Sequence, residues 1–103
     1  MLRGSELLGA VRGWISRAEH VSAGTGANSE IEESPGDRNP RSIRWILESP
    51  EMMSQIILWE DGQSEFDLID VATAEVRSEH RQIDSQQELD QVLEIVREWV
   101  IRS

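Results

Sequence analysis

Apolar residues near both ends of the chain recur with the spacing of an amphipathic helix. Near the N-terminus the apolar stripe consists of Leu7, Leu8, Val11, Trp14, Ile15 and Ala18. Near the C-terminus it consists of Leu89, Val92, Leu93, Val96, Trp99 and Val100. Ser85 and Glu88 have the S-x-x-E spacing of a capping box, which marks a helix start. The sequence therefore predicts one helix over residues 5–19 and another over residues 85–101.

Between residues 41 and 83 the apolar period changes to two, as in β-strands. Four strand-like segments follow one another: "RSIRWILE", "MSQIILWE", "SEFDLIDV" and "VRSEHRQI". Turns such as "EDGQ" and "ATAE" are too short for a crossover helix, so residues 41–83 are predicted to form an antiparallel meander. Residues 21–40 are rich in glycine and proline and predict a loop or linker, with a short edge strand near residues 30–33.

The order helix, meander, helix predicts an α+β fold, a two-layer sandwich in which both helices cover one face of a four- to five-stranded antiparallel sheet. A chain of 103 residues suits one domain, so residues 1–103 are assigned to a single domain. The other sheet face then stays uncovered. Because "QIILW" is apolar on both faces, either Ile57 and Trp59 or Ile56 and Leu58 must lie there. An exposed apolar patch is typical of a binding surface.

Charge narrows the range of partners. The chain holds twenty acidic residues against ten basic ones, for a net charge of −10. Nucleic acid and anionic membranes bind clustered positive charge, so we expect neither as a partner. No stretch reaches the ~20 apolar residues that span a bilayer, and arginines interrupt the N-terminal segment where a signal peptide needs an apolar core. Together with the absence of cysteine, these features favour a cytoplasmic protein.

The sequence offers little for catalysis. His20 and His80 are the two histidines of the chain, and no zinc-binding motif includes them. "EDGQSEFD" contains only fragments of a calcium-binding loop. No nucleophile, base and orienting group stand in a recognisable arrangement. We therefore expect no enzyme activity, no cofactor and no metal site.

The acidic hairpin at residues 54–70 suggests a protein partner instead. It holds five carboxylates and neither lysine nor arginine. Like charges on neighbouring strands repel, so a cationic partner would stabilise this surface. Of the two strand tryptophans, the one facing away from the helices would supply an aromatic anchor. The candidate partner-binding residues are Trp45, Trp59, Glu60, Asp61, Glu65, Asp67, Asp70 and Glu79.

Residues 57–96, "ILWEDGQSEFDLIDVATAEVRSEHRQIDSQQELDQVLEIV", resemble the TriTu family of immunity proteins. The shared features are a Trp-Glu-x-Gly turn, a strand ending in Leu-Ile-Asp, a second turn, a Glu-His pair and an acidic capped helix. The preceding "NPRSIRWILESPE" looks like the first firm strand of that family, which extends the resemblance to roughly residues 39–100. The resemblance implies an antitoxin that keeps a cognate ADP-ribosyltransferase toxin, the C-terminal domain of an Rhs-type or type VI effector, from modifying elongation factor Tu.

By the same resemblance, the protein occludes the active site of the toxin in a one-to-one complex, performs no chemistry of its own and is a monomer when free. An acidic inhibitor also suits the basic lining of a dinucleotide cleft. The alternative is a secretion chaperone, another small acidic cytoplasmic α+β class, which wraps an effector segment and usually dimerises. Mass in solution separates them, because the chaperone would be a stable homodimer bound to an unfolded segment.

Overall fold

A computed structural model describes residues 4–22, 28–34 and 41–101 of the chain. The elements, in order, are α1 (Gly4–Ser22), β1 (Asn28–Glu33), β2 (Ser42–Glu48), β3 (Met52–Trp59), β4 (Gln63–Asp70), β5 (Glu75–Gln82) and α2 (Gln86–Ile101). This confirms the predicted α+β fold, with an N-terminal and a C-terminal helix flanking a five-stranded antiparallel sheet.

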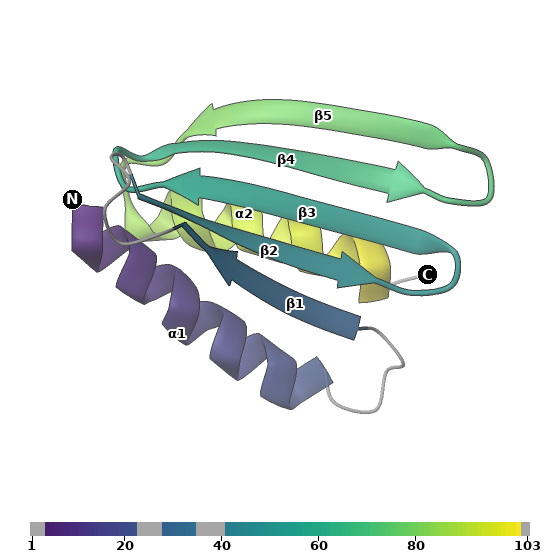
Figure 1. The fold of residues 1–103 in the computed structure, drawn as a ribbon, viewed down its shortest axis with the longest axis horizontal. Helices are drawn as coiled ribbons and strands as arrows, with labels where there is room; N and C mark the ends of the chain where they lie inside the picture. Colours follow the sequence, from purple (N-terminus) through teal and green to yellow (C-terminus); the bar gives the residue numbers. More distant parts are fainter. Residues whose placement is uncertain (1–3, 23–27, 35–40, 102–103) are drawn as a thin grey trace.

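The five strands follow one another across the sheet in the order β1-β2-β3-β4-β5, each antiparallel to its neighbour (Figure 1). The predicted loop over residues 21–40 contains β1, which pairs along its whole length with β2. The predicted loop was wrong at residues 21 and 22, which belong to α1, and its residues 23–27 and 35–40 lie outside the described residues, as do the side chains of Ala18 and His20.

Both helices pack on the same face of the sheet. The hydroxyl of Ser54 on β3 donates a hydrogen bond to the main-chain oxygen of Val96 on α2 (2.8 Å), which joins the two layers. The ring of Trp14 on α1 meets that of Trp45 on β2 edge to face, with centroids 5.6 Å apart, which joins the other helix to the sheet. The core between these layers contains Leu7, Leu8, Val11, Ile15, Ile43, Trp45, Leu47, Ile56, Leu58, Phe66, Leu68, Ile83, Leu89, Val92, Leu93, Val96 and Val100.

The β3–β4 turn depends on a glycine for two separate reasons. Gly62 has a φ of 95°, a left-handed conformation that L side chains rarely adopt. A Cβ atom there would lie only 2.6 Å from Nε2 of Gln82 and 2.7 Å from the main-chain oxygen of Ile83. This close approach lets the N–H of Ile83 donate to the oxygen of Gly62 (2.7 Å), so the turn also anchors the end of β5.

Candidate protein-binding surface

The sheet face turned away from the helices is here called the open face. In β2, β3 and β4 the buried positions alternate with partly or fully exposed ones, and the buried set points to the helices. Ile56 and Leu58 belong to the buried set, so Ile57 and Trp59 lie on the open face. The open face consists of Asn28, Glu30, Glu32, Ser42, Arg44, Ile46, Glu48, Met53, Gln55, Ile57, Trp59, Gln63, Glu65, Asp67, Ile69, Val76, Ser78, His80 and Gln82.

Apolar side chains form a row across one end of the open face. Met53 on β3 is opposite Ile69 on β4, which in turn is opposite Val76 on β5. The side of this row towards β5 is the most exposed, since Val76 retains 58% of its accessible surface. Apolar side chains with polar residues beside them are the composition of a protein-recognition surface.

The centre of the open face is occupied by a hydrogen-bonded carboxylate. Asp67 on β4 accepts a bond from Nε2 of Gln55 on β3 (2.7 Å) at one oxygen and from the hydroxyl of Ser78 on β5 (2.6 Å) at the other. Both carboxylate oxygens therefore have partners within the sheet. Asp67 is on the candidate surface, but its charge also holds three neighbouring strands in place.

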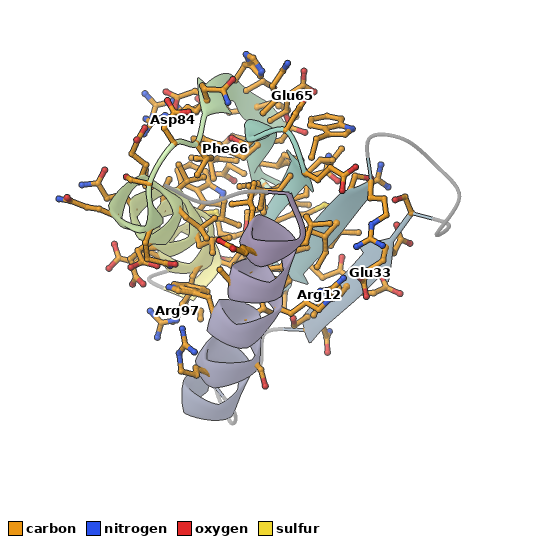
Figure 2. All side chains as sticks on the ribbon, turned by 90° about the vertical axis from the view of Figure 1, so that its left-hand side faces the viewer. Arg12, Glu33, Glu65, Phe66, Asp84 and Arg97 are labelled. Atoms are coloured by element: carbon orange, nitrogen blue, oxygen red, sulfur yellow. The ribbon has the colours of Figure 1, made fainter. Side chains whose placement is uncertain are left out.

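Glu65 is an exposed carboxylate near the middle of this face. It lies between Ile57 on β3 and His80 on β5, and within the described parts of the chain its side chain makes no hydrogen bond or ion pair. Figure 2 shows that Glu65 and its chain neighbour Phe66 point to opposite sides of the sheet, with Phe66 towards the helices. A partner can thus reach the Glu65 carboxylate without breaking any contact described here.

Three other acidic candidates lie in the turns. Glu60 is near Arg41, with 3.8 Å between the carboxylate and Nε. Asp61 accepts a hydrogen bond from the main-chain N–H of Gln63 (3.0 Å) in the same turn. Asp70, at the opposite end of the sheet, accepts from the N–H of Ala72 (3.0 Å) and thereby stabilises the β4–β5 turn. Both aspartates form the side-chain-to-backbone bonds typical of turn residues.

Two further predicted site residues lie within strands and face the helices. Trp45 is 2% exposed and sits in the core, where its Nε1 donates to the hydroxyl oxygen of Ser29 (2.9 Å). Trp59 is therefore the strand tryptophan that faces away from the helices. Glu79 lies on the helix side of β5, opposite Phe66, and forms an ion pair with Arg81 (2.9 Å). Glu65 is opposite His80 in the β4–β5 pairing, so Glu79, the neighbour of His80, points to the other face of the sheet.

Sequence reasoning missed part of this surface. The acids of β1 extend it, since Glu32 pairs with Arg44 on the open face (3.4 Å) and Glu30 lies beside it. The apolar row was also missed, although Met53 and Ile69 alternate with buried residues in the sequence and could have been assigned by their period. Glu30 and Glu32 could not be found in this way, because one apolar residue in β1 shows no period.

A tie between layers lies at the edge of the sheet. Arg12 of α1 donates from Nε to the Glu33 carboxylate of β1 (2.9 Å), and Figure 2 shows the two side chains beside each other. The hydrogen bond from Arg12 lowers the pKa of Glu33 and raises the pKa of Arg12.

In the described ranges, no group of three potential ligands is placed to hold a metal ion. No helix in these ranges is long and apolar enough to span a membrane.

The described residues form a two-layer α+β domain whose uncovered sheet face combines an apolar row with carboxylates, a mixture that is common at protein-binding surfaces. The chain belongs to the TriTu family, because a family model described as "Immunity protein TriTu" matches residues 10–99. That match begins within α1, includes all five strands and ends within α2. A search of curated proteins found no match. Membership gives the chain an immunity role, which implies that it binds a cognate toxin.

Proposed function

We propose that this immunity protein binds a cognate ADP-ribosyltransferase toxin domain, one per chain, and occludes its active site with the open face of the sheet. The observations that carry the proposal are an apolar row at one end of the sheet face that the helices leave uncovered and, on the other side of Asp67 from that row, an accessible Glu65. In this proposal the toxin is the C-terminal domain of an Rhs-type or type VI effector, and the protein acts in the cytoplasm without chemistry, cofactor or metal of its own.

Charge supports this choice of partner. A cleft that binds a nicotinamide dinucleotide needs positive or N–H-rich walls for the pyrophosphate. The chain presents a net charge of −10, and the carboxylates of Glu30, Glu60, Asp61 and Glu65 lie on or beside the open face. Complementary charge of this kind directs two proteins to each other and excludes like-charged competitors such as nucleic acid.

Trp59 is the proposed anchor of the interface. It is half-buried at the end of β3, next to the turn that carries Glu60 and Asp61. A tryptophan that is already partly packed loses little freedom when a partner covers it, which is one reason that tryptophan recurs at binding hot spots. Asp70 and Glu79 lie at the far turn and on the helix side, so they contribute to the overall charge rather than to the contact.

The test compares two acid-to-arginine variants of equal charge. Glu65→Arg changes the open face, whereas Glu98→Arg changes an exposed residue of α2. At a salt concentration that screens the net charge, we expect Glu65→Arg to weaken toxin binding by at least about tenfold, because an attraction becomes a like-charge contact, and Glu98→Arg to have little effect. The readouts are the affinity for the toxin domain and growth of cells that express it. Equal affinities for the two variants would contradict the open face as the binding surface.

A further inference from the structure

The free edge of β5 is the feature of this fold that toxin binding through the open face does not use. β5 is the last strand of the sheet, and none of the described strands pairs with its outer side (Figure 1). All eight of its residues are exposed. An exposed strand of this length presents a row of unpaired main-chain groups to any other strand.

The side chains of β5 alternate in charge on the helix side of the sheet. That side carries Glu75, Arg77, Glu79 and Arg81 in turn, and they are opposite Asp70, Leu68, Phe66 and Ser64 of β4. The guanidinium of Arg81 lies 5.6 Å from the ring centroid of Phe66. Arg81 also pairs with Glu79 on the same strand. Acids and bases therefore alternate at fixed positions along the free edge.

We propose that two copies of this chain pair antiparallel through β5, about a twofold axis at Ser78. The axis makes residues equally distant from Ser78 opposite each other. Glu75 is then opposite Arg81 of the second copy, and Arg77 is opposite Glu79. All four charged positions of the strand meet the opposite charge, twice over in the dimer. Cross-strand pairs of opposite charge stabilise a sheet, and like charges directly opposite destabilise it.

The same pattern opposes neighbouring registers. Moving the axis by one residue, to Arg77, would place Arg77 against itself and Glu75 against Glu79. Moving it to Glu79 would place that acid against itself and Arg77 against Arg81. Each of these arrangements is repulsive at every pair named, so the alternation disfavours both registers that lie one residue from the one centred on Ser78.

The main-chain N–H and C=O groups of β5 point in the directions that this pairing needs. The hydrogen bond from Ile83 N–H to Gly62 makes these two residues a bonded pair of the β4–β5 ladder. Bonded pairs alternate along an antiparallel ladder, so the main-chain groups of Val76, Ser78 and His80 are directed to the free edge. Ser78 would then bond with itself across the axis, and Val76 with His80. The charged pairs would occupy the non-bonded positions, where side chains come closest.

The opposite edge of the sheet does not offer the same pairing. β1 has Glu30 and Glu32 on the open face and Glu33 on the other, so two β1 strands would bring acids together. Pairing through β5 is therefore isologous and closes at a dimer instead of growing into a filament. The two open faces lie on the same side of the joined sheet, and both stay accessible to a toxin. This dimer differs from the free monomer expected from the sequence, and the inference does not depend on the identity of the toxin.

The test uses two variants of the whole chain, Arg77→Glu and Glu79→Arg. Each alone places like charges opposite in the dimer, so each should weaken association by at least about tenfold. Mixed together they should form a heterodimer. Residues 77 and 79 are both acidic in one variant and both basic in the other, so opposite charges meet at both of these pairs. The double variant should dimerise like the wild type. The measurement is sedimentation equilibrium from about 10 μM to about 1 mM, the range in which weak dimers dissociate.

A wild-type chain that stays monomeric across that range would overturn the proposal. So would a mixture of the two variants that associates no better than either variant alone. Val76→Pro provides a second test without a change of charge, because it removes an N–H directed to the free edge and leaves the bonds to β4 in place. It should abolish the dimer while far-UV circular dichroism stays unchanged. A Val76→Pro protein that still dimerises would place the interface elsewhere.

Discussion

At the residue scale, a single alanine in the β4–β5 turn holds a conformation that suits glycine. Ala74 has a φ of 62°, and among the residues that the structure describes no other non-glycine residue has a positive φ. A left-handed conformation costs an L-residue roughly 1–2 kcal/mol, and the cost is absent for glycine. The Asp70 carboxylate helps to stabilise this turn, because it also accepts a hydrogen bond from the N–H of Thr73 (3.2 Å).

Replacing that alanine should therefore stabilise the protein. We expect Ala74→Gly to raise the free energy of unfolding by about 1 kcal/mol. Glycine removes the cost of the left-handed conformation, and the greater entropy of the unfolded chain offsets part of that gain. Ala72→Gly in the same turn is the matched control and should lower it by up to about 1 kcal/mol, because its φ is not positive. Urea unfolding measures both. Equal effects from the two substitutions would show that Ala74 is not strained.

The candidate residues differ in how far the sequence could predict them. Alternation puts Trp59 on the same face of its strand as Ile57, and Glu65 on the same face of its strand as Asp67, because the strand period is a local property. The sequence left open which face of β3 the helices cover, and the pairing of β3 with β4 shows that Trp59 and Glu65 share the open face. Alternation does not reveal that Gln55 and Ser78 both donate to Asp67, since these residues meet only through the pairing of β3, β4 and β5. A charge reversal at Asp67 would thus disturb the sheet and the surface together, and Glu65 is the better probe of binding.

At the element scale, β1 depends on contacts from outside the strand. Its six residues are all exposed, and its apolar content is a single isoleucine. It is held by pairing with β2, by the bond between Ser29 and the Trp45 ring, and by the Arg12–Glu33 pair with α1. The sequence predicts α2 well because its cap, its apolar stripe and its length agree locally. It predicts β1 poorly because tertiary contacts form that strand.

The Arg12–Glu33 pair should make stability depend on pH. The pKa of Glu33 is lower in the folded chain, so its contribution is fully present above the unfolded pKa and disappears as pH falls through the folded one. Glu33→Gln should therefore lower the melting temperature at neutral pH, and the difference from the wild type should start to shrink below about pH 4.3, the usual pKa of glutamate, and vanish below the lower pKa of the folded chain. Both partners are exposed, so the loss should stay under about 1 kcal/mol.

The control for this pH effect is Glu30→Gln. Glu30 is on the same strand, and its side chain has no ion pair or hydrogen bond with other described residues. It should melt like the wild type throughout the pH range. A Glu33→Gln protein whose melting temperature differs from the wild type by the same amount at neutral and at acid pH would contradict the role given to the carboxylate charge.

At the scale of the whole molecule, the net charge should act on encounter rather than on the bound complex. A charge of −10 attracts a basic partner over about 8–10 Å at physiological salt, which is farther than any single contact reaches. Contacts on the open face act only after docking. We therefore expect the net charge to change mainly the association rate, and the fit of the open face to change mainly the dissociation rate.

The same two arginine variants separate these contributions. Glu65→Arg and Glu98→Arg each change the net charge from −10 to −8, since an acid is replaced by a base. At low salt both should slow association with the toxin to a similar extent, and raising the salt from about 0.05 M to about 0.5 M should remove that difference from the wild type. Only Glu65→Arg should also speed dissociation, at every salt concentration, because only that residue lies in the proposed contact. Stopped-flow association and dissociation rates measure both effects. An association rate of the wild type that does not change with salt would contradict steering by net charge, and faster dissociation of Glu98→Arg would move the contact to the helix side.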